Sequence, residues 1–317
     1  MSTLRESVES YLLTRRAMGF KVEGLAKLLI SFAKYCQEQG IDQVRTDIAV
    51  QWATSQIKVP VNDALFARRM DAVRIFAKHQ QALDPATQIP PDGICNRRYQ
   101  PREPNVFTPA QISALQTATD TLSPQFRALT WRNLIGLLAV TGMRPGEACR
   151  LSIEDIDLAR GLIQILETKF SKSRLVILHP TATQELNHYL QVRAAWAATI
   201  TADCPRVFLN TRGTAMAPGR LSTIFNRLAA AAGITTARGH RPPRLHDLRH
   251  TFAVTTLLEW YQAGEEVQAR LPLLSTWLGH ADPASTYWYL HAVPELLEHA
   301  GRRRDAHEAS QHAEPAS

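Results

Sequence analysis

The chain has 317 residues, 45% of them hydrophobic, and 36 lysines and arginines against 29 acidic residues, so its formal net charge is +7 and its pI about 9.4. This length favours two domains, and the hydrophobic content is sufficient for real cores. No apolar run approaches the roughly 20 residues of a membrane span, and the first residues lack the apolar segment of a secretory signal. The basic balance suits a polyanionic partner, although many basic proteins bind no nucleic acid.

The positions of the cysteines and lysines give further information about the class of protein. The four cysteines form no CxxC pair, which argues against a zinc ribbon or a disulfide framework, fits a reducing cytoplasm and predicts small buried side chains. They are Cys36, Cys95, Cys149 and Cys204. After residue 104 the only lysines are Lys169 and Lys172, and arginine supplies the other basic groups. Arginine suits bidentate phosphate contact, and a GC-rich genome would explain the same bias equally well.

Residues 1–83 are predicted to form a small helical domain. Apolar residues recur at helical spacing between Leu25 and Cys36, and Gly40 ends that helix. Thr46-Asp47 can cap the next helix, and a further helix is expected around residues 65–78. Four basic residues lie on this last helix. Contact of their side chains with DNA phosphates and simple exposure to water are equally good interpretations. They are Arg68, Arg69, Arg74 and Lys78.

Residues 84–104 contain five prolines and Gly93, which predicts a semi-rigid linker. Thr108-Pro109-Ala110-Gln111 then offers an N-cap threonine, a proline at the first helical position and a glutamine three residues after the cap. The second domain is therefore placed at residues 105–301. Residues 302–317 show no apolar face and are expected to be a disordered tail.

The second domain is predicted to be mostly helical with one short strand pair. Helices are expected around residues 131–138 and over 181–198, 220–232 and 246–262. The β-branched runs 162–166 and 175–178 flank a short polar turn and predict a hairpin.

The segment Thr141-Gly142-Met143-Arg144-Pro145-Gly146-Glu147 is the first candidate site motif. A helix should end at Gly142 and another begin at Pro145, which would aim the Arg144 guanidinium out of a helix–helix junction. Taken alone, a surface arginine paired with Glu147 is the simpler interpretation.

His246-Asp247-Leu248-Arg249-His250 is the second motif. His246 and Arg249 are three residues apart and share one helix face. Arg241 and Arg244 add positive charge at the start of the helix, which opposes the helix dipole and is better tolerated at an anion site. His250 is expected to face elsewhere and to be structural. A structural cap is the alternative for His246, and a metal site including His240 finds no support in carboxylate or cysteine spacing.

Leu278-Gly279-His280 is the third motif, and Tyr289 follows it after nine residues. Gly279 would allow a sharp turn before His280. Tyr287 and Tyr261 are the rival tyrosines.

Together, the three motifs resemble the signature of the tyrosine recombinase (phage integrase) family, which exchanges DNA strands using a tyrosine nucleophile. The resemblance runs from Arg144 to His291 and covers the first domain only in outline. It implies a mainly α fold: an N-terminal helical core-binding (SAM-like) domain and a mostly helical catalytic domain with a small β-hairpin or sheet, closing as a C-shaped clamp on DNA. The short chain looks closer to Xer-type or transposon-encoded recombinases than to long phage integrases.

The resemblance also assigns expected roles. Tyr289 would be the nucleophile, and the family's catalytic lysine lies in the hairpin turn. Alignment favours Lys169, but Phe170 replaces the glycine commonly found next, so Lys172 stays open as a supporting or alternative residue. The other catalytic positions implied are Arg144, His246, Arg249 and His280, with Glu147 and His250 supporting and Arg241 and Arg244 near the DNA.

The implied reaction cleaves and rejoins DNA through a 3′-phosphotyrosine, without ATP, metal or cofactor. The ester keeps the phosphodiester bond energy, and the protein contributes mainly positioning and charge. The implied partners are double-stranded DNA and four protomers on two DNA sites, with accessory or partner recombinases and no membrane, in the bacterial cytoplasm at the nucleoid. The alternatives are a type IB topoisomerase-like relaxing enzyme, a non-catalytic DNA-binding protein and, more distantly, a metal hydrolase.

Overall fold

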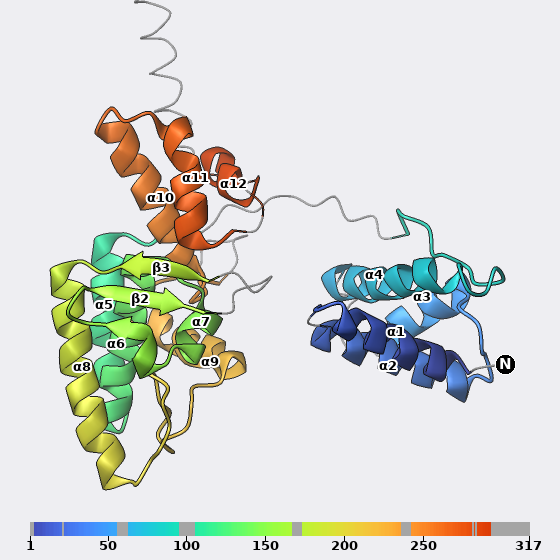
Figure 1. The fold of residues 1–317 in the computed structure, drawn as a ribbon, viewed down its shortest axis with the longest axis horizontal. Coiled ribbons are helices and arrows are strands. Elements are labelled where there is room, and N and C mark those ends of the chain that lie inside the picture. The colour runs from blue at the N-terminus through green and yellow to red at the C-terminus, as the bar shows by residue number, and fades with distance from the viewer. Residues whose placement is uncertain are drawn as a thin grey trace, which may run out of the picture. The chain divides into compact units, whose positions relative to one another are not determined.

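The computed structural model describes residues 3–20, 22–55, 63–94, 105–166, 173–235, 242–280, 282 and 284–292 (Figure 1). The chain divides into two units, Met1–Gln100 and Pro101–Ser317. Each unit has a hydrophobic core of its own. The expected tail at residues 302–317 lies outside the described residues.

The described part of the first unit is helical. It contains α1 (Leu4–Ala17), α2 (Glu23–Glu38), α3 (Thr46–Ser55) and α4 (Asp63–Gln80). Thr3 caps α1 through its hydroxyl, and Glu6 returns the contact to the Thr3 N–H at 2.8 Å. The buried faces meet in a core where the rings of Phe32 and Trp52 pack edge to face, 5.2 Å apart.

Residues 84–94, which we expected to be linker, pack against this first unit. Thr46 donates its N–H to Gln88 Oε1 at 3.0 Å, and the partly buried Ile89 and Ile94 contact the helical core. Arg74 donates to the carbonyls of Pro90 and Pro91. The prolines stiffen this stretch, but their carbonyls are bound by the unit itself, so the unit extends beyond residue 83.

The second unit is built mainly of helices, as predicted. They are α5 (Pro109–Ala118), α6 (Gln125–Thr141), α7 (Pro145–Arg150), α8 (Pro180–Thr199), α9 (Pro218–Ala231), α10 (Asp247–Gln262), α11 (Val267–Leu278) and α12 (Ala284–Ala292). The predicted start of α5 is confirmed: Gln111 N–H donates to the Thr108 hydroxyl at 3.2 Å, and the Gln111 side chain accepts from Thr108 N–H at 2.9 Å. The fold class is therefore mainly α.

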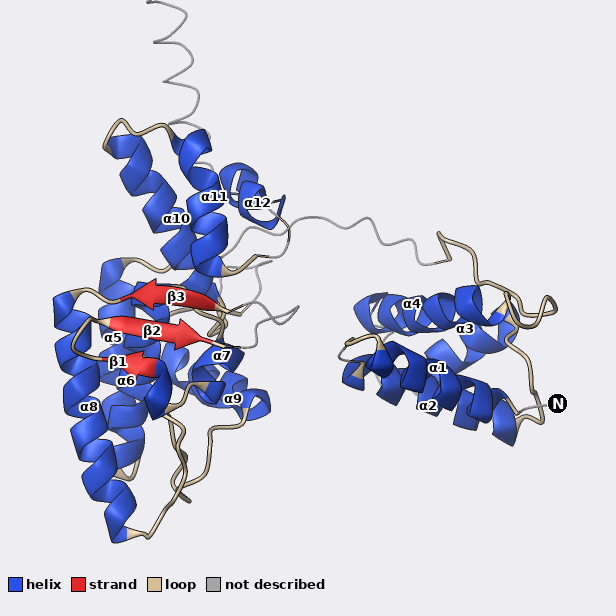
Figure 2. Ribbon diagram, in the orientation of Figure 1, coloured by secondary structure: helices blue, strands red, loops and turns tan. Residues whose placement is uncertain are grey.

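A small antiparallel sheet lies beside these helices (Figure 2). The predicted hairpin is confirmed as β2 (Leu162–Ile165) and β3 (Arg174–Ile177), and β1 (Ile156–Asp157) adds a third strand. Ile163 pairs with Val176, and both are buried. The register also pairs Ile165 with Arg174, which points the Arg174 side chain inward.

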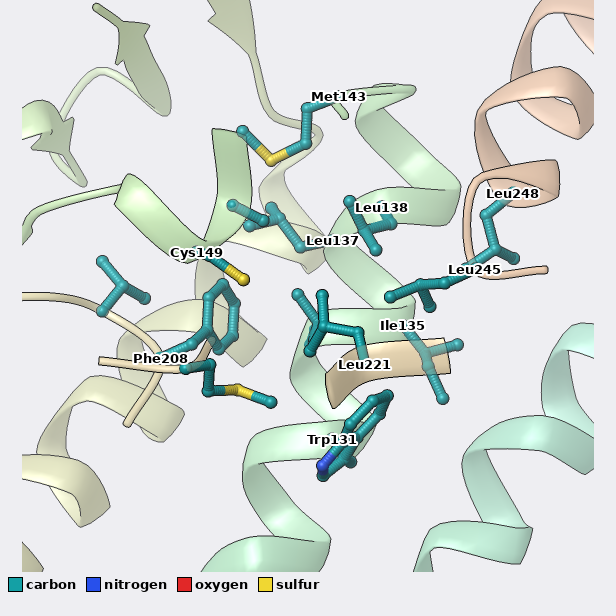
Figure 3. Close-up of a cluster of buried hydrophobic side chains, with 14 of the residues drawn as sticks. Trp131, Ile135, Leu137, Leu138, Met143, Cys149, Phe208, Leu221, Leu245 and Leu248 are labelled. Atoms are coloured by element: carbon teal, nitrogen blue, oxygen red, sulfur yellow. The ribbon is translucent and has the colours of Figure 1, made fainter. Parts of the chain in front are cut away.

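Helix α6 forms the centre of the main core, with α5, α8 and α10 packed against it. Trp131, Ile135 and Leu138 of α6 are buried there together with Phe208 and Leu221 (Figure 3). The end of α6 is thereby fixed by packing on several sides, and the first site motif begins at that end.

A second cluster lies where α10, α11 and α12 meet beyond β3 (Figure 1). It buries Leu257, Leu271, Leu274 and Leu278 together with Tyr289. Helix α11 also contacts β3, so the C-terminal helices and the sheet meet near Gly279. Among the described helices, none combines the length and apolar character needed to span a membrane.

The cysteines lie where isolated small side chains are expected. Cys36 and Cys149 are buried, Cys204 is partly buried, and all three are free thiols. Burial raises the pKa of the Cys36 thiol to about 12 and that of Cys149 to about 11, so both are protonated and unreactive at neutral pH. Cys95 lies outside the described residues.

Candidate active site

Arg144 stands at the junction predicted from the sequence. Helix α6 ends at Gly142, which adopts the left-handed conformation at φ 63°, and Pro145 starts α7. The Arg144 side chain, 31% exposed, donates to Glu147 Oε1 at 2.8 Å and to the Gly279 carbonyl at 3.0 Å. These contacts hold the guanidinium in place while leaving part of it open to solvent.

Glu147 forms ion pairs with two arginines, Arg144 and Arg174. Its side chain is 2% exposed and also receives a bidentate pair from Arg174, at 3.2 and 2.7 Å. Burial alone would raise the Glu147 pKa, but the hydrogen bonds and charge of Arg174, with those of Arg144, lower it to about 2. Glu147 is therefore ionised at any working pH, and its negative charge keeps the two guanidinium groups side by side.

Arg174 is a residue of this site that none of the three sequence motifs contains. Its Nε donates to the Trp277 carbonyl at 2.7 Å, and its guanidinium fills the space that a side chain on Gly279 would need. The contact joins β3 to the end of α11. The sequence did contain one signal: an arginine begins an apolar strand at a position whose side chain faces inward. A buried arginine is rare unless its charge is paired.

Arg249 is the most buried cation of the cluster, at 1% exposure. Its Nη1 donates to the Gly142 carbonyl at 2.9 Å, which ties α10 to the end of α6. Its Nη2 is buried and has no hydrogen-bond partner among the described residues. Burial, and then the charge of Arg144, lowers the Arg249 pKa to about 10, so it stays protonated at neutral pH. An unpaired buried donor of this kind is costly and suits a site that awaits an anion.

His280 follows the turn at Gly279, which adopts φ 67° and ends α11. Its Nδ1 lies 2.7 Å from the Thr286 hydroxyl, and its ring stacks at 6.4 Å from that of Tyr289. Burial, followed by the charges of Arg249 and Arg144, lowers the His280 pKa to about 3. A neutral imidazole at pH 7 can still donate one N–H.

Tyr289 points its hydroxyl into the same cluster. It is 2% exposed, and its Oη lies 3.0 Å from His250 Nδ1. Burial raises the Tyr289 pKa, and the positive charges of Arg249 and Arg144 offset part of that rise. The rival Tyr287 is 44% exposed on the opposite side of α12. Tyr261 lies near the end of α10 and is partly buried against the same cluster as Tyr289.

The prediction that His250 faces away from the site is wrong. One helical turn separates it from His246, so both project from the same side of α10, and their rings meet edge to face at 4.9 Å. Burial is the main cause that lowers the pKa of each histidine to about 4; the charges of Arg244 and Arg249 act in the same direction, and the charge of Asp247 opposes them. The sequence spacing could have indicated this contact, since i and i+4 are neighbours on a helix.

Some expected residues lie apart from the cluster or outside the described residues. Lys169, Lys172 and Arg241 are outside them. Arg244 is half exposed and donates to the buried Asp247 at 3.0 Å. Its backbone N–H also contacts that carboxylate at 2.8 Å, so Arg244 helps to fix the start of α10.

The basic residues of α4 divide into two kinds. Arg68 and Lys78 are exposed. Arg69 donates to the Ala53 carbonyl at 3.1 Å and lies over the Trp52 ring. Arg74 is 11% exposed and binds Asp71 and the 90–91 carbonyls, which corrects its interpretation as a free phosphate contact.

No group of three or more histidine, cysteine, aspartate or glutamate side chains within the described ranges could hold a metal ion. His240, one member of the alternative metal set, is not among those residues. His250 and His280 instead lie close to Arg249 and to Tyr289, a composition suited to binding an anion.

Comparison with known proteins identifies the family. The sequence model of the phage integrase family matches residues 105–295. The chain belongs to the phage integrase family. The integrase/recombinase y4rB of Sinorhizobium fredii is 36% identical, over 96% of this chain and 97% of its own, and y4rE of the same organism is 33% identical, over 95% of each. The tyrosine recombinase XerD of Ralstonia nicotianae is 28% identical, over 81% of this chain and 85% of its own.

Solved structures agree with this membership at the level of fold. The Tn1549 transposon integrase in complex with transposon right-end DNA is 16% identical, with a TM-score of 0.66 over 95% of this chain and 99% of that one. A lambda integrase dimer bound to a COC′ core site is 18% identical, with a TM-score of 0.61 over 89% and 96%. As a member of the phage integrase family, this chain is a tyrosine recombinase, a DNA breaking and rejoining enzyme.

Proposed function

We propose that this recombinase acts at specific DNA sites and cleaves and rejoins strands through a 3′-phosphotyrosine intermediate, using neither ATP nor a metal ion. One observation carries the proposal: the buried Tyr289 hydroxyl lies in the field of Arg249 and Arg144, and Arg249 keeps an unpaired, buried Nη2. The charge of Arg174 also acts on Arg249, so the positive charges of Arg144, Arg174 and Arg249 lie around the one negative charge of Glu147. That excess positive charge suits a phosphodiester.

The proposed roles follow from these positions. Arg144 and Arg249 bind the non-bridging oxygens of the scissile phosphate and disperse the charge that develops in the transition state. His280 and His246, neutral at pH 7, each donate an N–H to the phosphate. Tyr289 Oη attacks phosphorus, the bond to the 5′ oxygen breaks, and Lys169 protonates that oxygen, with Lys172 as the alternative acid.

Rejoining reverses these steps. The 5′-hydroxyl of a DNA strand attacks the phosphotyrosine, and the phenol of Tyr289 leaves. Because each step exchanges one phosphate ester for another, no external energy source is required.

The proposed architecture is the predicted one, a core-binding domain at residues 1–83, a linker at 84–104 and a catalytic domain at 105–301 that close as a clamp on duplex DNA, with one change: residues 84–94 belong to the core-binding domain, on which they pack. The first unit would contact phosphates through Arg68 and Lys78, which are exposed on α4. Phosphate contacts of this kind position a protein without reading sequence. We place its action on the DNA of the bacterial cytoplasm.

The proposed working assembly is four protomers on two DNA sites, with accessory or partner recombinases where the sites require them. The lambda integrase tetramer bound to a Holliday junction and the XerH recombinase bound to difH share this fold. Integration or transposition of a mobile element is the expected outcome, in line with the fold shared with the Tn1549 transposon integrase.

Adduct capture tests the proposal. Wild-type protein and Tyr289→Phe are expressed in the same cells, denatured rapidly and purified, and any DNA that remains attached is sequenced. DNA recovered at a defined sequence on wild type alone is the expected result. Wild type without DNA, or DNA on both proteins, would contradict the mechanism. The Tyr289→Phe change removes one hydroxyl and keeps the ring packed in the α10–α12 cluster.

A further inference from the structure

Arg174 is a buried arginine whose guanidinium nitrogens all donate to the protein. Its side chain is 6% exposed. Nη1 and Nη2 donate to the two carboxylate oxygens of Glu147 at 3.2 and 2.7 Å, and Nε donates to the Trp277 carbonyl at 2.7 Å. Arg174 is therefore placed to hold other residues of the site and not to bind the substrate.

Arg144 and Arg174 are held by the same two elements. Each carboxylate oxygen of Glu147, on α7, accepts one hydrogen bond from each of the two arginines, at 2.7 to 3.2 Å. At the end of α11, the Trp277 carbonyl accepts from Arg174 and the Gly279 carbonyl accepts from Arg144. Both guanidinium groups thus connect α7 to the end of α11. Arg174 is the buried one of the pair, and Arg144, at 31% exposure, is the one that a phosphate can reach.

The turn that presents His280 lies directly on Arg174. A Cβ on Gly279 would lie 2.7 Å from Arg174 Nη1 and 3.1 Å from its Cζ, so only a glycine lets the guanidinium come this close. His280 follows this glycine, and its backbone N–H donates to the Ser275 carbonyl at 3.0 Å. The turn is therefore fixed by the last turn of α11 and by Arg174.

We propose that Arg174 is a positioning residue of DNA cleavage, which holds Arg144 through Glu147, and His280 through the turn at Gly279, where they meet the scissile phosphate. This rests on the proposed function. The role requires an arginine, because a planar guanidinium can donate to a carboxylate with two nitrogens and to a carbonyl with the third, whereas a lysine has one nitrogen. Misplacing a catalytic group by about 1 Å can slow a reaction by about 10²-fold.

The charge of Arg174 acts on the same groups. Burial is the main cause of the low pKa of His280, and the charge of Arg174 acts in the same direction, after those of Arg249 and Arg144. Arg174 thus helps to keep the imidazole neutral. A purely structural ion pair is the competing interpretation. It would change the stability of the fold and leave the reaction rate of each folded molecule unchanged.

The test compares DNA binding with the rate of DNA cleavage. Full-length Arg174→Lys keeps the positive charge and loses the three-way contact. It is given an excess of a duplex that carries the sequence recovered by adduct capture. Arg160→Lys is the matched control, because Arg160 is 78% exposed. The rate constant of adduct formation is compared and not the amount of adduct, so a partly unfolded variant does not count as slow.

Arg174→Lys is expected to bind the duplex as wild type does and to form the adduct about 10²-fold more slowly, while Arg160→Lys matches wild type in both measurements. A rate within a few-fold of wild type would overturn the proposal, and so would a loss of rate that weaker binding explains in full. Wild-type protein must form the adduct in the same experiment, so a failure of the proposed function would be seen separately.

A double-mutant cycle tests whether Arg174 acts through Arg144. Rates are measured for Arg144→Lys, for Arg174→Lys and for the double variant. Because both changes disturb one placed guanidinium, the double variant should be little slower than the slower single variant. Losses that multiply would show that the two residues act independently and would contradict the proposal.

Gly279→Ala provides a second way to disturb the contact if Arg174→Lys does not fold. This variant keeps Arg174 in the chain and pushes its guanidinium away from the turn. It should bind the duplex normally and form the adduct about tenfold more slowly, since the displacement is smaller. A rate equal to that of wild type would count against a positioning role for Arg174.

Discussion

Replacing Arg174 by methionine should destabilise the second unit by about 3 kcal/mol at pH 7. The structure supplies the magnitude, because the Glu147 pKa falls from its ordinary 4.5 to about 2 with Arg174 as the main partner, and each tenfold change in acidity is worth about 1.4 kcal/mol. Breaking a buried ion pair by removing one partner costs about 3–5 kcal/mol, which is consistent. Methionine keeps much of the side-chain volume, so the loss reports the charge.

The pH dependence has a defined sign. The folded-state pKa of Glu147 lies below its unfolded value, so its stabilising contribution is complete above pH 4.5 and is lost as the pH falls toward 2. The difference in stability between wild type and Arg174→Met should therefore shrink between pH 5 and pH 3. Hydrogen exchange in peptides from β3 and α6 measures the opening free energy of the second unit separately from the first.

A matched control is available on the same unit. Arg160 is 78% exposed and 3.8 Å from Asp157, so Arg160→Met should change stability by less than about 0.5 kcal/mol. A cost below about 1 kcal/mol for Arg174→Met, or a cost that stays constant as the pH falls, would refute the reasoning that the buried charge pair holds this junction.

Three further predictions concern the end of α11. Gly279→Ala should destabilise the protein by about 1–2 kcal/mol in a thermal melt, because φ is 67° and the new Cβ would lie 2.7 Å from Arg174 Nη1. Gly219→Ala is the control, since Gly219 has open space around it, and this change should not lower the Tm. Equal Tm values for the two variants would contradict the prediction. Thr286→Val removes the partner of His280 Nδ1 and should slow adduct formation about tenfold, the value of roughly one hydrogen bond; an unchanged rate would show that the contact is dispensable. The pKa of His280 lies near 3 when folded and 6.5 when unfolded, so stability should fall as the pH drops from 6.5 toward 3, and a His280→Asn variant that melts with the same pH slope would contradict this.

Local signals in the sequence predicted the scaffold of the site well. The Thr108 cap, the end of α6 at Gly142 and the start of α7 at Pro145 are all confirmed. Each depends on backbone chemistry within one turn, which a single residue type can determine. The hairpin was equally visible, because its apolar runs are short and bounded by a polar turn.

Contacts between distant segments could not be predicted in the same way. Arg174 and Glu147 are 27 residues apart in sequence, and Arg144 meets Gly279 across 135. Such contacts arise when α11 packs on β3, and the helical or strand periodicity of a sequence does not indicate that packing. The orientation of His250 toward Tyr289 was missed for the same reason, since the partner lies on another helix.

The most direct test of the account identifies the residue that carries the DNA. Adduct trapped from wild-type protein is digested with nuclease and protease, and the nucleotide-linked peptide is sequenced by mass spectrometry. We expect a phosphate ester on Tyr289, whose hydroxyl lies among Arg249, Arg144 and His250. An ester on Tyr287 or Tyr261, or on a residue other than tyrosine, would contradict it.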